Sequence, residues 1–281
     1  VEQVRVRLQA ESVLALLQDA SDTLPSGEDV TEPVYGAPAR WILPEAQEDA
    51  ALAGHTIVTP NEVLATHLLE TIKKNFARLL SLRTMRRLLD EMVNLSDQDR
   101  AEANRKVIDE LIPDRVPIDT LHSVLRLLLE EQVSIRNLPL ILEAIAEARL
   151  QTTQTGAICE HVRQRLGFQL VATMRREDGT IPLIQLAPEW EDTFSNYQIE
   201  AERGSLDVAL PPDLCKRLAA WIGRKCGGAR ERGIYPALVT WTRRRRFLRT
   251  VRTANAISNP VLSFEEIGLE AKPALVGLIA A

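Results

Sequence analysis

Apolar residues recur at helical spacing through the middle of the chain. Two sets show the spacing i, i+3, i+4, i+7: Leu121, Val124, Leu125 and Leu128, then Leu138, Ile141, Leu142 and Ile145. This periodicity is typical of amphipathic helices that bury one face. Because similar spacing extends on both sides, residues 81–167 are predicted to form an all-helical subdomain.

From residue 168 the helical period gives way to short apolar runs separated by Gly and Pro. The runs are 168–174, 181–186, 235–241 and 260–264. The first two flank Asp178-Gly179 and are typical of a β-hairpin, whereas the last two are typical of buried parallel strands. A helix predicted over 243–251 joins those two strands, so a right-handed parallel crossover is expected. The tail from Ala271 is apolar but short, and it is expected to be poorly ordered.

A well-marked helix start occurs near the N-terminal end, at Thr59-Pro60-Asn61-Glu62. A hydroxyl residue, then Pro, then Glu at the third helical position is the pattern of a capping box. The apolar stripe of this helix is predicted to face the core; it consists of Leu64, Leu68, Ile72, Phe76 and Leu79. Val63 and Thr66 lie well off that stripe, so they are expected to contact another subdomain or a ligand.

Composition narrows the class of protein. The 281 residues suffice for two or more domains, and the formal net charge of −5 argues against a general nucleic-acid binder. The three cysteines are widely spaced without a C-x-x-C motif, which suits reduced thiols in the cytosol. No apolar run approaches the roughly 20 residues of a membrane span. Because the chain begins at Val1, it is expected to be a fragment of a longer protein.

Catalytic and metal-binding patterns are not found in the sequence. The four histidines have no ligand at metal-site spacing, and no phosphate-binding loop or nucleophile motif occurs. We therefore expect no enzymatic activity, no cofactor, no bound zinc or iron and no hydrolysis of ATP or GTP. Arg243–Arg246 is the only charge run. Either it is a solvated face at a helix start, or it is an anion or partner site compensated by acidic residues of an adjacent subunit.

Three segments resemble a known family: EPVYGAPARWI from Glu32, GHTIVTPNEVLATHL from Gly54, and TLHSVLRLLLEEQVSIRNLPLILEAIAE from Thr120. The chain is similar over residues 27–267 to the FlhA/LcrD (FHIPEP) family of type III export-gate proteins, and it is closer to the flagellar branch. The resemblance implies an α+β fold of several subdomains. Residues 1–30 would be the remnant of an inserted α/β subdomain with a linker, and 31–80 the second half of a small first α/β subdomain. The all-helical middle subdomain over 81–167 and a C-terminal α/β subdomain over 168–281 would follow.

The resemblance also implies a function. Family members are non-enzymatic docking platforms at the cytoplasmic face of the bacterial inner membrane, attached to a membrane-embedded N-terminal part that this chain lacks. They form a homo-oligomeric ring, typically of nine subunits, and bind export chaperone–cargo complexes and components of the export ATPase complex. Position by position, the family's chaperone site falls on Glu32, Tyr35 and Thr66, with Val58 and Val63 as its apolar wall. Glu32 and Tyr35 stand where the family usually has Asp and Phe.

Two alternatives remain open from the sequence. One is an export gate of the injectisome branch, which has the same class of function and different cargo. The other is a helix-turn-helix DNA-binding regulator that would use residues 117–150 and the arginine run. The second predicted helix of that pair offers Glu143 and Glu147 against Arg149 alone, so packing is favoured over DNA recognition.

Overall fold

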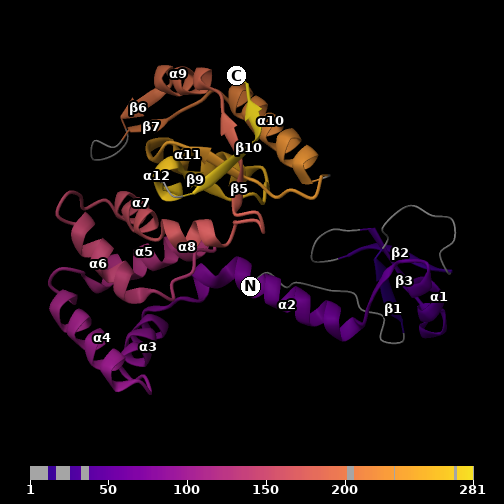
Figure 1. The fold of residues 1–281 in the computed structure, drawn as a ribbon, viewed down its shortest axis with the longest axis horizontal. Helices are drawn as coiled ribbons and strands as arrows, with labels where there is room; N and C mark the ends of the chain where they lie inside the picture. The colour runs from indigo at the N-terminus through magenta and orange to yellow at the C-terminus, as the bar shows by residue number, and fades with distance from the viewer. Residues whose placement is uncertain are drawn as a thin grey trace. The chain divides into compact units, whose positions relative to one another are not determined.

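A computed structural model describes residues 12–16, 26–32, 38–200, 206–230, 232–268 and 271–280. The chain forms two compact units, residues 1–79 and residues 80–281 (Figure 1). Within the described ranges, no helix is long and apolar enough to cross a membrane. The mixture of helices and sheets confirms the predicted α+β fold class, whereas the subdomain boundaries proposed from the sequence stay a prediction.

The first unit is built on a four-stranded antiparallel sheet in the order β2-β3-β1-β4. The strands are β1 (Val13–Leu16), β2 (Gly27–Thr31), β3 (Pro38–Ile42) and β4 (Thr56–Val58). A short 3₁₀ turn, η1 (Pro44–Ala46), and helix α1 (Gln47–Leu52) connect β3 to β4. Side chains alternate between the two sheet faces, so Val13 and Ala15 pack with Ala50 of α1 while Leu14 points to the other face.

Helix α2 (Pro60–Leu79) begins with the predicted capping box. The Thr59 backbone N–H donates to Glu62 Oε2 at 2.8 Å, and the Glu62 N–H approaches Thr59 Oγ1 at 3.4 Å. The sequence prediction of which face of α2 is buried is wrong. Val63, expected to lie off the core stripe, is 2% exposed and packs on the sheet. The side chains of the predicted stripe are partly or largely exposed: Leu64, Leu68, Ile72, Phe76 and Leu79.

The second unit begins with a run of helices, which confirms the helical prediction. They are α3 (Leu82–Val93), α4 (Gln98–Leu111), α5 (Ile118–Glu130), α6 (Leu138–Ala148), α7 (Thr155–Arg165) and α8 (Gly167–Ala172). The periodic apolar residues of α5 and α6 are fully or almost fully buried in one core with Val162 of α7. Burial of these faces supplies most of the driving force for the helices to pack together.

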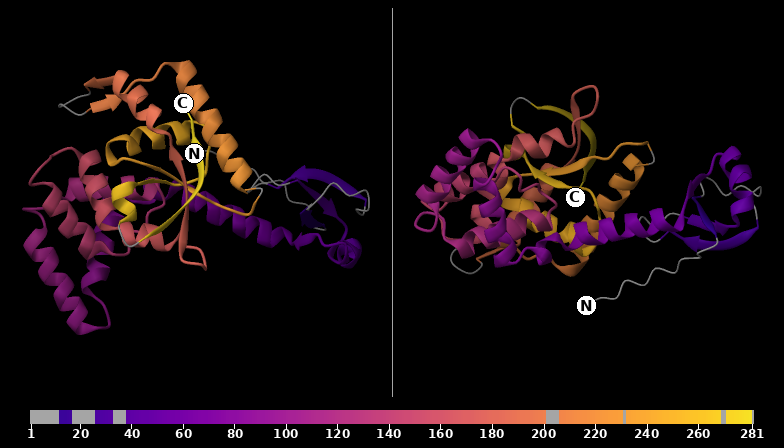
Figure 2. Two further views of the ribbon diagram at one scale, coloured as in Figure 1. Left: turned by 45° about the horizontal axis from the view of Figure 1, so that its top comes forward. Right: turned by 90° about the horizontal axis from the view of Figure 1, so that it is seen from below.

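The rest of the second unit is a parallel sheet in the order β10-β5-β8-β9, with helices on both faces. The strands are β5 (Thr180–Leu186), β8 (Ala237–Thr240), β9 (Val261–Ser263) and β10 (Lys272–Ile279). The helices are α9 (Pro188–Asn196), α10 (Pro212–Arg230), α11 (Thr242–Ala254) and α12 (Phe264–Ile267), and a small ribbon pairs β6 (Gln198–Glu200) with β7 (Leu206–Val208). Helix α10 packs against β10 (Figure 2). The predicted parallel crossover from β8 through α11 to β9 is confirmed.

Two elements of this region differ from the sequence prediction. The sequence predicts a strand of a β-hairpin over residues 168–174, but helix α8 occupies 168–172, a turn follows, and β5 pairs in parallel with β8 and β10. Gly167 permits the observed packing, because a Cβ there would lie 2.3 Å from the Glu266 carbonyl oxygen, so only glycine lets α8 begin this close to α12. The tail from Ala271 is likewise not disordered. It forms the edge strand β10, and Ile279 is fully buried.

Candidate docking site

The predicted docking residues belong to the first unit. Tyr35 lies outside the described residues. Val63 packs with Leu14, Ala39 and Trp41 in one apolar cluster on the α2 side of the sheet, and Val58 packs against that cluster. The structure therefore brings Val58 and Val63 together, and Val63 serves the core of the unit.

Thr66 lies one turn beyond Val63 on the same side of α2 and is half-buried. Glu32 directly follows β2 and is 7% exposed. Since Val30 faces the apolar cluster and side chains alternate along a strand, Glu32 belongs to the same sheet face.

Strand register shows how wide this face is. Glu28, Trp41, Leu14 and Val58 form one cross-strand row. Glu32 lies four residues beyond Glu28, on the edge strand opposite Val58. With about 4.8 Å between strands and about 3.4 Å per residue, Glu32 and Val58 are separated by roughly 20 Å. Glu32 and Val58 thus lie at opposite sides of a broad face and not in one small pocket.

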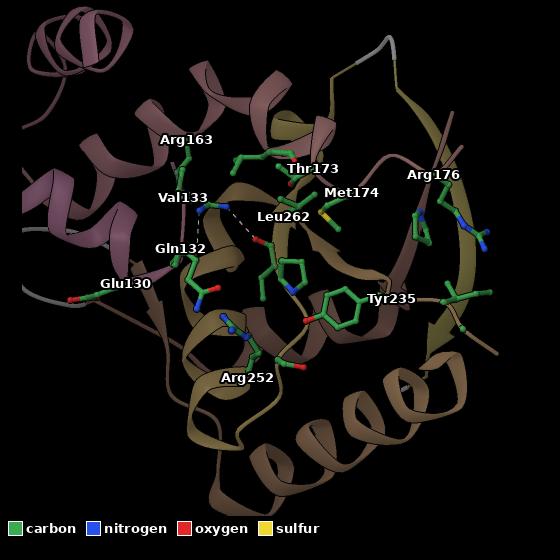
Figure 3. Close-up of a pocket in the computed structure, with 18 residues that line it drawn as sticks. Glu130, Gln132, Val133, Arg163, Thr173, Met174, Arg176, Tyr235, Arg252 and Leu262 are labelled. Atoms are coloured by element: carbon green, nitrogen blue, oxygen red, sulfur yellow. Dashed lines mark hydrogen bonds and ion pairs between the residues drawn. The ribbon is translucent and has the colours of Figure 1, made fainter. Parts of the chain in front are cut away.

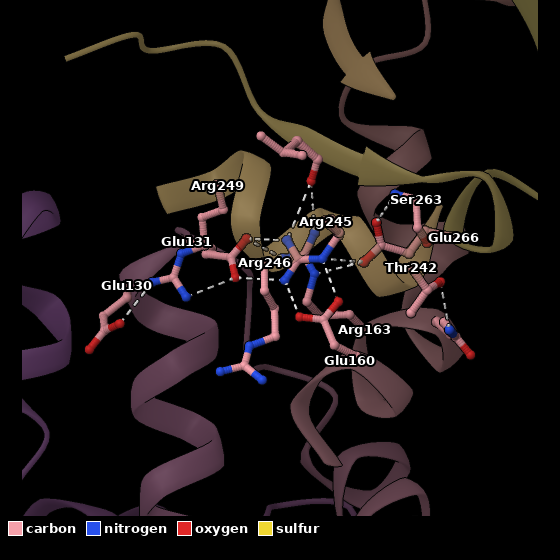
Figure 4. Close-up of polar contacts among 12 residues, drawn as sticks. Glu130, Glu131, Glu160, Arg163, Thr242, Arg245, Arg246, Arg249, Ser263 and Glu266 are labelled. Atoms are coloured by element: carbon pink, nitrogen blue, oxygen red, sulfur yellow. Dashed lines mark hydrogen bonds and ion pairs between the residues drawn. The ribbon is translucent and has the colours of Figure 1, made fainter. Parts of the chain in front are cut away.

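The second unit contains a buried cluster of arginines and glutamates that the sequence analysis did not foresee (Figure 4). The Arg245 side chain is completely buried and bonds two carboxylates, with Nη1 2.5 Å from Glu131 Oε2 and Nε 2.5 Å from Glu160 Oε2. Arg163 contacts two further carboxylates, Glu131 at 3.2 Å and Glu266 at 2.6 Å, and so links them. The cluster therefore ties α5 and α7 of the helical region to α11 and α12 of the α/β region.

Burial and ion pairing compete in this cluster. Burial by itself would raise the pKa of Glu131, but the hydrogen bond from Arg245 and the charges of Arg163, Arg245 and Arg249 outweigh it, and the pKa lies below its usual value. Burial would lower the pKa of Arg245, but hydrogen bonds to Glu160 and Glu131 raise it. At Glu266 burial dominates and raises the pKa. The cationic neighbours of Glu131 thus hold its carboxylate in the charged form.

The arginine run at the start of α11 is compensated within the chain. Arg243 and Arg244 both contact Glu191, at 2.7 and 3.0 Å, and the Arg244 side chain is buried. Arg245 is the centre of the buried cluster, and the exposed Arg246 lies over Gly156. The solvated-face interpretation is therefore wrong for Arg244 and Arg245, and the acids that offset the helix dipole belong to the same subunit.

The DNA-binding alternative fails on burial. Helix α6 would be the recognition helix, yet seven of its eleven residues are buried. A recognition helix needs a solvent-facing surface that can enter the major groove. In the described part of the chain, no group of three or more His, Cys, Asp or Glu side chains is placed to hold a metal ion.

Sequence reasoning missed the ion cluster because its members are far apart along the chain. Arg245 lies 85 residues from Glu160 and 114 residues from Glu131. The one available signal was the unusual arginine run at a helix N-terminus, which demands nearby negative charge.

Comparison with known proteins places this fold. The chain matches the sequence model of the FHIPEP family over residues 1–272. It is 36% identical over 253 residues to the flagellar biosynthesis protein FlhA of Caulobacter vibrioides, covering 90% of this chain and 35% of that protein. It is 38% identical over 201 residues to FlhA of Escherichia coli, covering 72% of this chain and 27% of that protein. The chain thus spans well under half of the length of these relatives.

Solved structures have the same fold. The nonameric SctV-C of EPEC matches with a TM-score of 0.74 at 17% identity, over 97% of this chain and 79% of that one. The CdsV protein of Chlamydia pneumoniae matches with a TM-score of 0.76 at 23% identity, over 97% of this chain and 76% of that one. With a family match that spans nearly the whole sequence and a shared fold, the chain belongs to the FHIPEP family of type III export-gate proteins.

Proposed function

We propose that this chain is the docking platform of a flagellar type III protein export gate. The observation that carries the proposal is the 36% identity to a flagellar biosynthesis protein across 90% of the chain. A second relative, at 38% identity, is also a flagellar biosynthesis protein. These two matches support the flagellar branch over the injectisome branch.

The docking face we propose is the α2 side of the first unit, framed by Glu32, Val58 and Thr66, and the family resemblance of the sequence adds Tyr35 to it. Val63 stabilises this face from within the unit, because it is buried in the apolar cluster between α2 and the sheet. A face roughly 20 Å wide by the strand spacing suits a protein partner such as an export chaperone with its cargo, and it is too broad for a small molecule.

Assembly and further partners are part of the same proposal. Two solved relatives in fold are described as nonameric, and CdsV has been solved in complex with CdsO. By extension, this chain forms a homo-oligomeric ring, contacts components of the export ATPase complex, and lies at the cytoplasmic face of the inner membrane as part of a longer membrane protein. Its role is binding, and no catalytic step is assigned to it.

Calorimetric titration with purified chaperone–cargo complexes tests the proposal. Flagellar complexes from the same organism should bind, injectisome complexes should bind at least tenfold more weakly, and Thr66→Ala should weaken the flagellar complexes. Thr71→Ala, a matched change elsewhere on α2, should leave affinity unchanged. Equal binding of both kinds of complex would contradict the flagellar assignment, and binding of neither would contradict the docking function.

A further inference from the structure

A cavity of about 490 Å³ opens in the second unit where its helical and α/β regions meet (Figure 3). Its walls come from the end of α5, from α7, α8 and α11, and from β9 with the segment that precedes β8. This volume lies within the usual range of ligand sites, about 300–1,000 Å³. The proposed docking face makes no use of it, because that face belongs to the first unit.

The floor of the cavity is apolar and fixed. Val133, Val261 and Leu262 are each less than 5% exposed, and Leu170, Met174 and Pro260 complete the lining on this side. These side chains are held by the cores of the helical and α/β regions. A preformed apolar floor favours a ligand that brings an apolar group.

Arg252 is one of three arginines in the lining, with Arg176 and with Arg163, which is already paired with two glutamates. The Nε of Arg252 donates to the Ile257 carbonyl at 2.8 Å, which fixes the guanidinium and leaves its two terminal amino groups available. Within the described residues, no hydrogen bond or ion pair engages those amino groups. Burial lowers the pKa of Arg252 despite the opposing effect of Glu131 and Tyr235. The guanidinium is therefore partly desolvated and would gain from an anionic partner.

Gln132 and Tyr235 line the same cavity (Figure 3). Gln132 has a φ of 57°, an unusual backbone conformation for a residue other than glycine. This conformation ends helix α5, since the Gln132 N–H donates to the Leu129 carbonyl and the Val133 N–H to the Leu128 carbonyl, each at 3.0 Å. Tyr235 is 49% exposed, so its ring and hydroxyl are accessible from solvent.

The local charge balance favours an anion. Glu131 is shared among Arg163, Arg245 and Arg249, and Glu130 is bonded by Arg249 at 2.8 Å. The carboxylates of the lining are thus neutralised by other arginines. Arg252 adds a positive charge that none of these glutamates pairs with directly.

We propose that this cavity binds an acidic peptide segment, with one carboxylate on the terminal amino groups of Arg252 and an adjacent apolar side chain on the floor. A planar carboxylate matches the two amino groups of a guanidinium bidentately. A phosphate, with about two negative charges, fits less well beside Glu130 and Glu131. The inference extends the proposed docking function to a second surface, where exported or regulatory chains would present an acidic residue beside an aliphatic one.

Methyl NMR of the whole 281-residue chain tests this directly, because the chain has only three methionines. Met174 lines the cavity, whereas Met85 is fully buried in the helical core and serves as an internal reference. The probes are the blocked peptide acetyl-Ala-Leu-Asp-Ala-amide, its Asn counterpart and inorganic phosphate. The Asp peptide should shift Met174 saturably and leave Met85 unmoved, and the Asn peptide and phosphate should each bind at least tenfold more weakly.

Variants connect the signal to the cavity. Arg252→Gln should weaken the Asp peptide at least tenfold, while Arg105→Gln, the same change at an exposed arginine of α4, should have no effect. Thr173→Trp fills the cavity and leaves the Arg252 side chain in place, so it should abolish the Met174 shift that the Asp peptide induces. This second variant tests the proposal if Arg252→Gln does not fold. No Met174 shift, equal binding of the Asp and Asn peptides, preferential binding of phosphate, or unchanged binding in a folded variant would overturn the proposal. No chaperone is used, so this outcome is independent of the test of the docking face.

Discussion

Replacing Glu131 by Gln should strongly destabilise the second unit. The Glu131 side chain is only 6% exposed and lies within 3.4 Å of three guanidinium groups, those of Arg163, Arg245 and Arg249. Removing one partner of a buried ion pair costs about 3–5 kcal/mol, because the remaining charge stays buried without compensation. Glutamine keeps the volume and one acceptor oxygen but removes the charge.

The expected magnitude lies at the lower end of that range. After the substitution, each of the three arginines keeps one acidic partner: Glu266 for Arg163, Glu160 for Arg245 and Glu130 for Arg249. We therefore expect a loss of about 3 kcal/mol in the free energy of unfolding. For a unit of this size about 1 kcal/mol corresponds to about 2–4 °C, so the melting temperature should fall by roughly 6–12 °C.

The neighbouring residue provides a matched control. Glu130 also pairs with an arginine, at 2.8 Å, but its side chain is 42% exposed. Glu130→Gln should therefore cost less than about 1 kcal/mol. Urea denaturation followed by circular dichroism, with calorimetry for the melting temperature, measures both variants. If Glu131→Gln and Glu130→Gln cost the same, the cluster does not stabilise the fold in the way described.

Three further predictions follow from the same structure. Since Glu131 has a lowered pKa in the folded chain, its contribution to stability is complete above the ordinary carboxyl pKa of about 4.3 and is lost as the pH falls further. The difference in stability between wild type and Glu131→Gln, measured by urea denaturation from pH 7 to pH 3, should therefore narrow below pH ~4 and not above it. Gly167→Ala should lower the free energy of unfolding, measured by thermal unfolding, by about 1–3 kcal/mol, because the added Cβ would meet backbone atoms. In Gly156→Ala the added Cβ meets only the exposed end of Arg246, so the free energy of unfolding should not change. Equal costs for the two variants would contradict the close approach of α8 to α12. Burial raises the pKa of Cys159 to about 12 and of Cys226 to about 11. A disulfide reagent at pH 8 should therefore modify the half-buried Cys215 first and the other two cysteines only after unfolding. Rapid modification of all three thiols in the native chain would contradict the burial of Cys159 and Cys226.

Local sequence signals predicted local structure well. The Thr59–Glu62 capping box and the periodic residues of α5 and α6 needed only neighbours a few positions away, and the structure confirms them. The apolar run at β8 correctly predicted a buried strand, since every residue of β8 is buried in the structure. Such signals depend on helical or strand periodicity within one element.

Errors arose where a distant element decides the outcome. Helix α2 has apolar residues on both sides, and only the sheet, which packs on Val63, determines which side is the core. The run 168–174 is too short for periodicity to separate strand from helix, and its close approach to Glu266 could not be known. The pairing of Arg245 with Glu131 depends on the fold alone. The docking residues came from family resemblance, since Val58, Val63 and Thr66 have no chemistry that marks a site by itself.

The most direct test of the docking function compares affinity with stability in one pair of variants. A flagellar chaperone–cargo complex is titrated into the chain and into Tyr35→Ala, and the melting temperature of each is recorded, with Val63→Ala as the reference for a core defect. Because an aromatic anchor often dominates a protein interface, Tyr35→Ala should cost about 2 kcal/mol or more in binding while the melting temperature hardly changes. Val63→Ala should chiefly lower the melting temperature, since the side chain is buried against Trp41. An unchanged affinity for a folded Tyr35→Ala variant would contradict the proposed docking face.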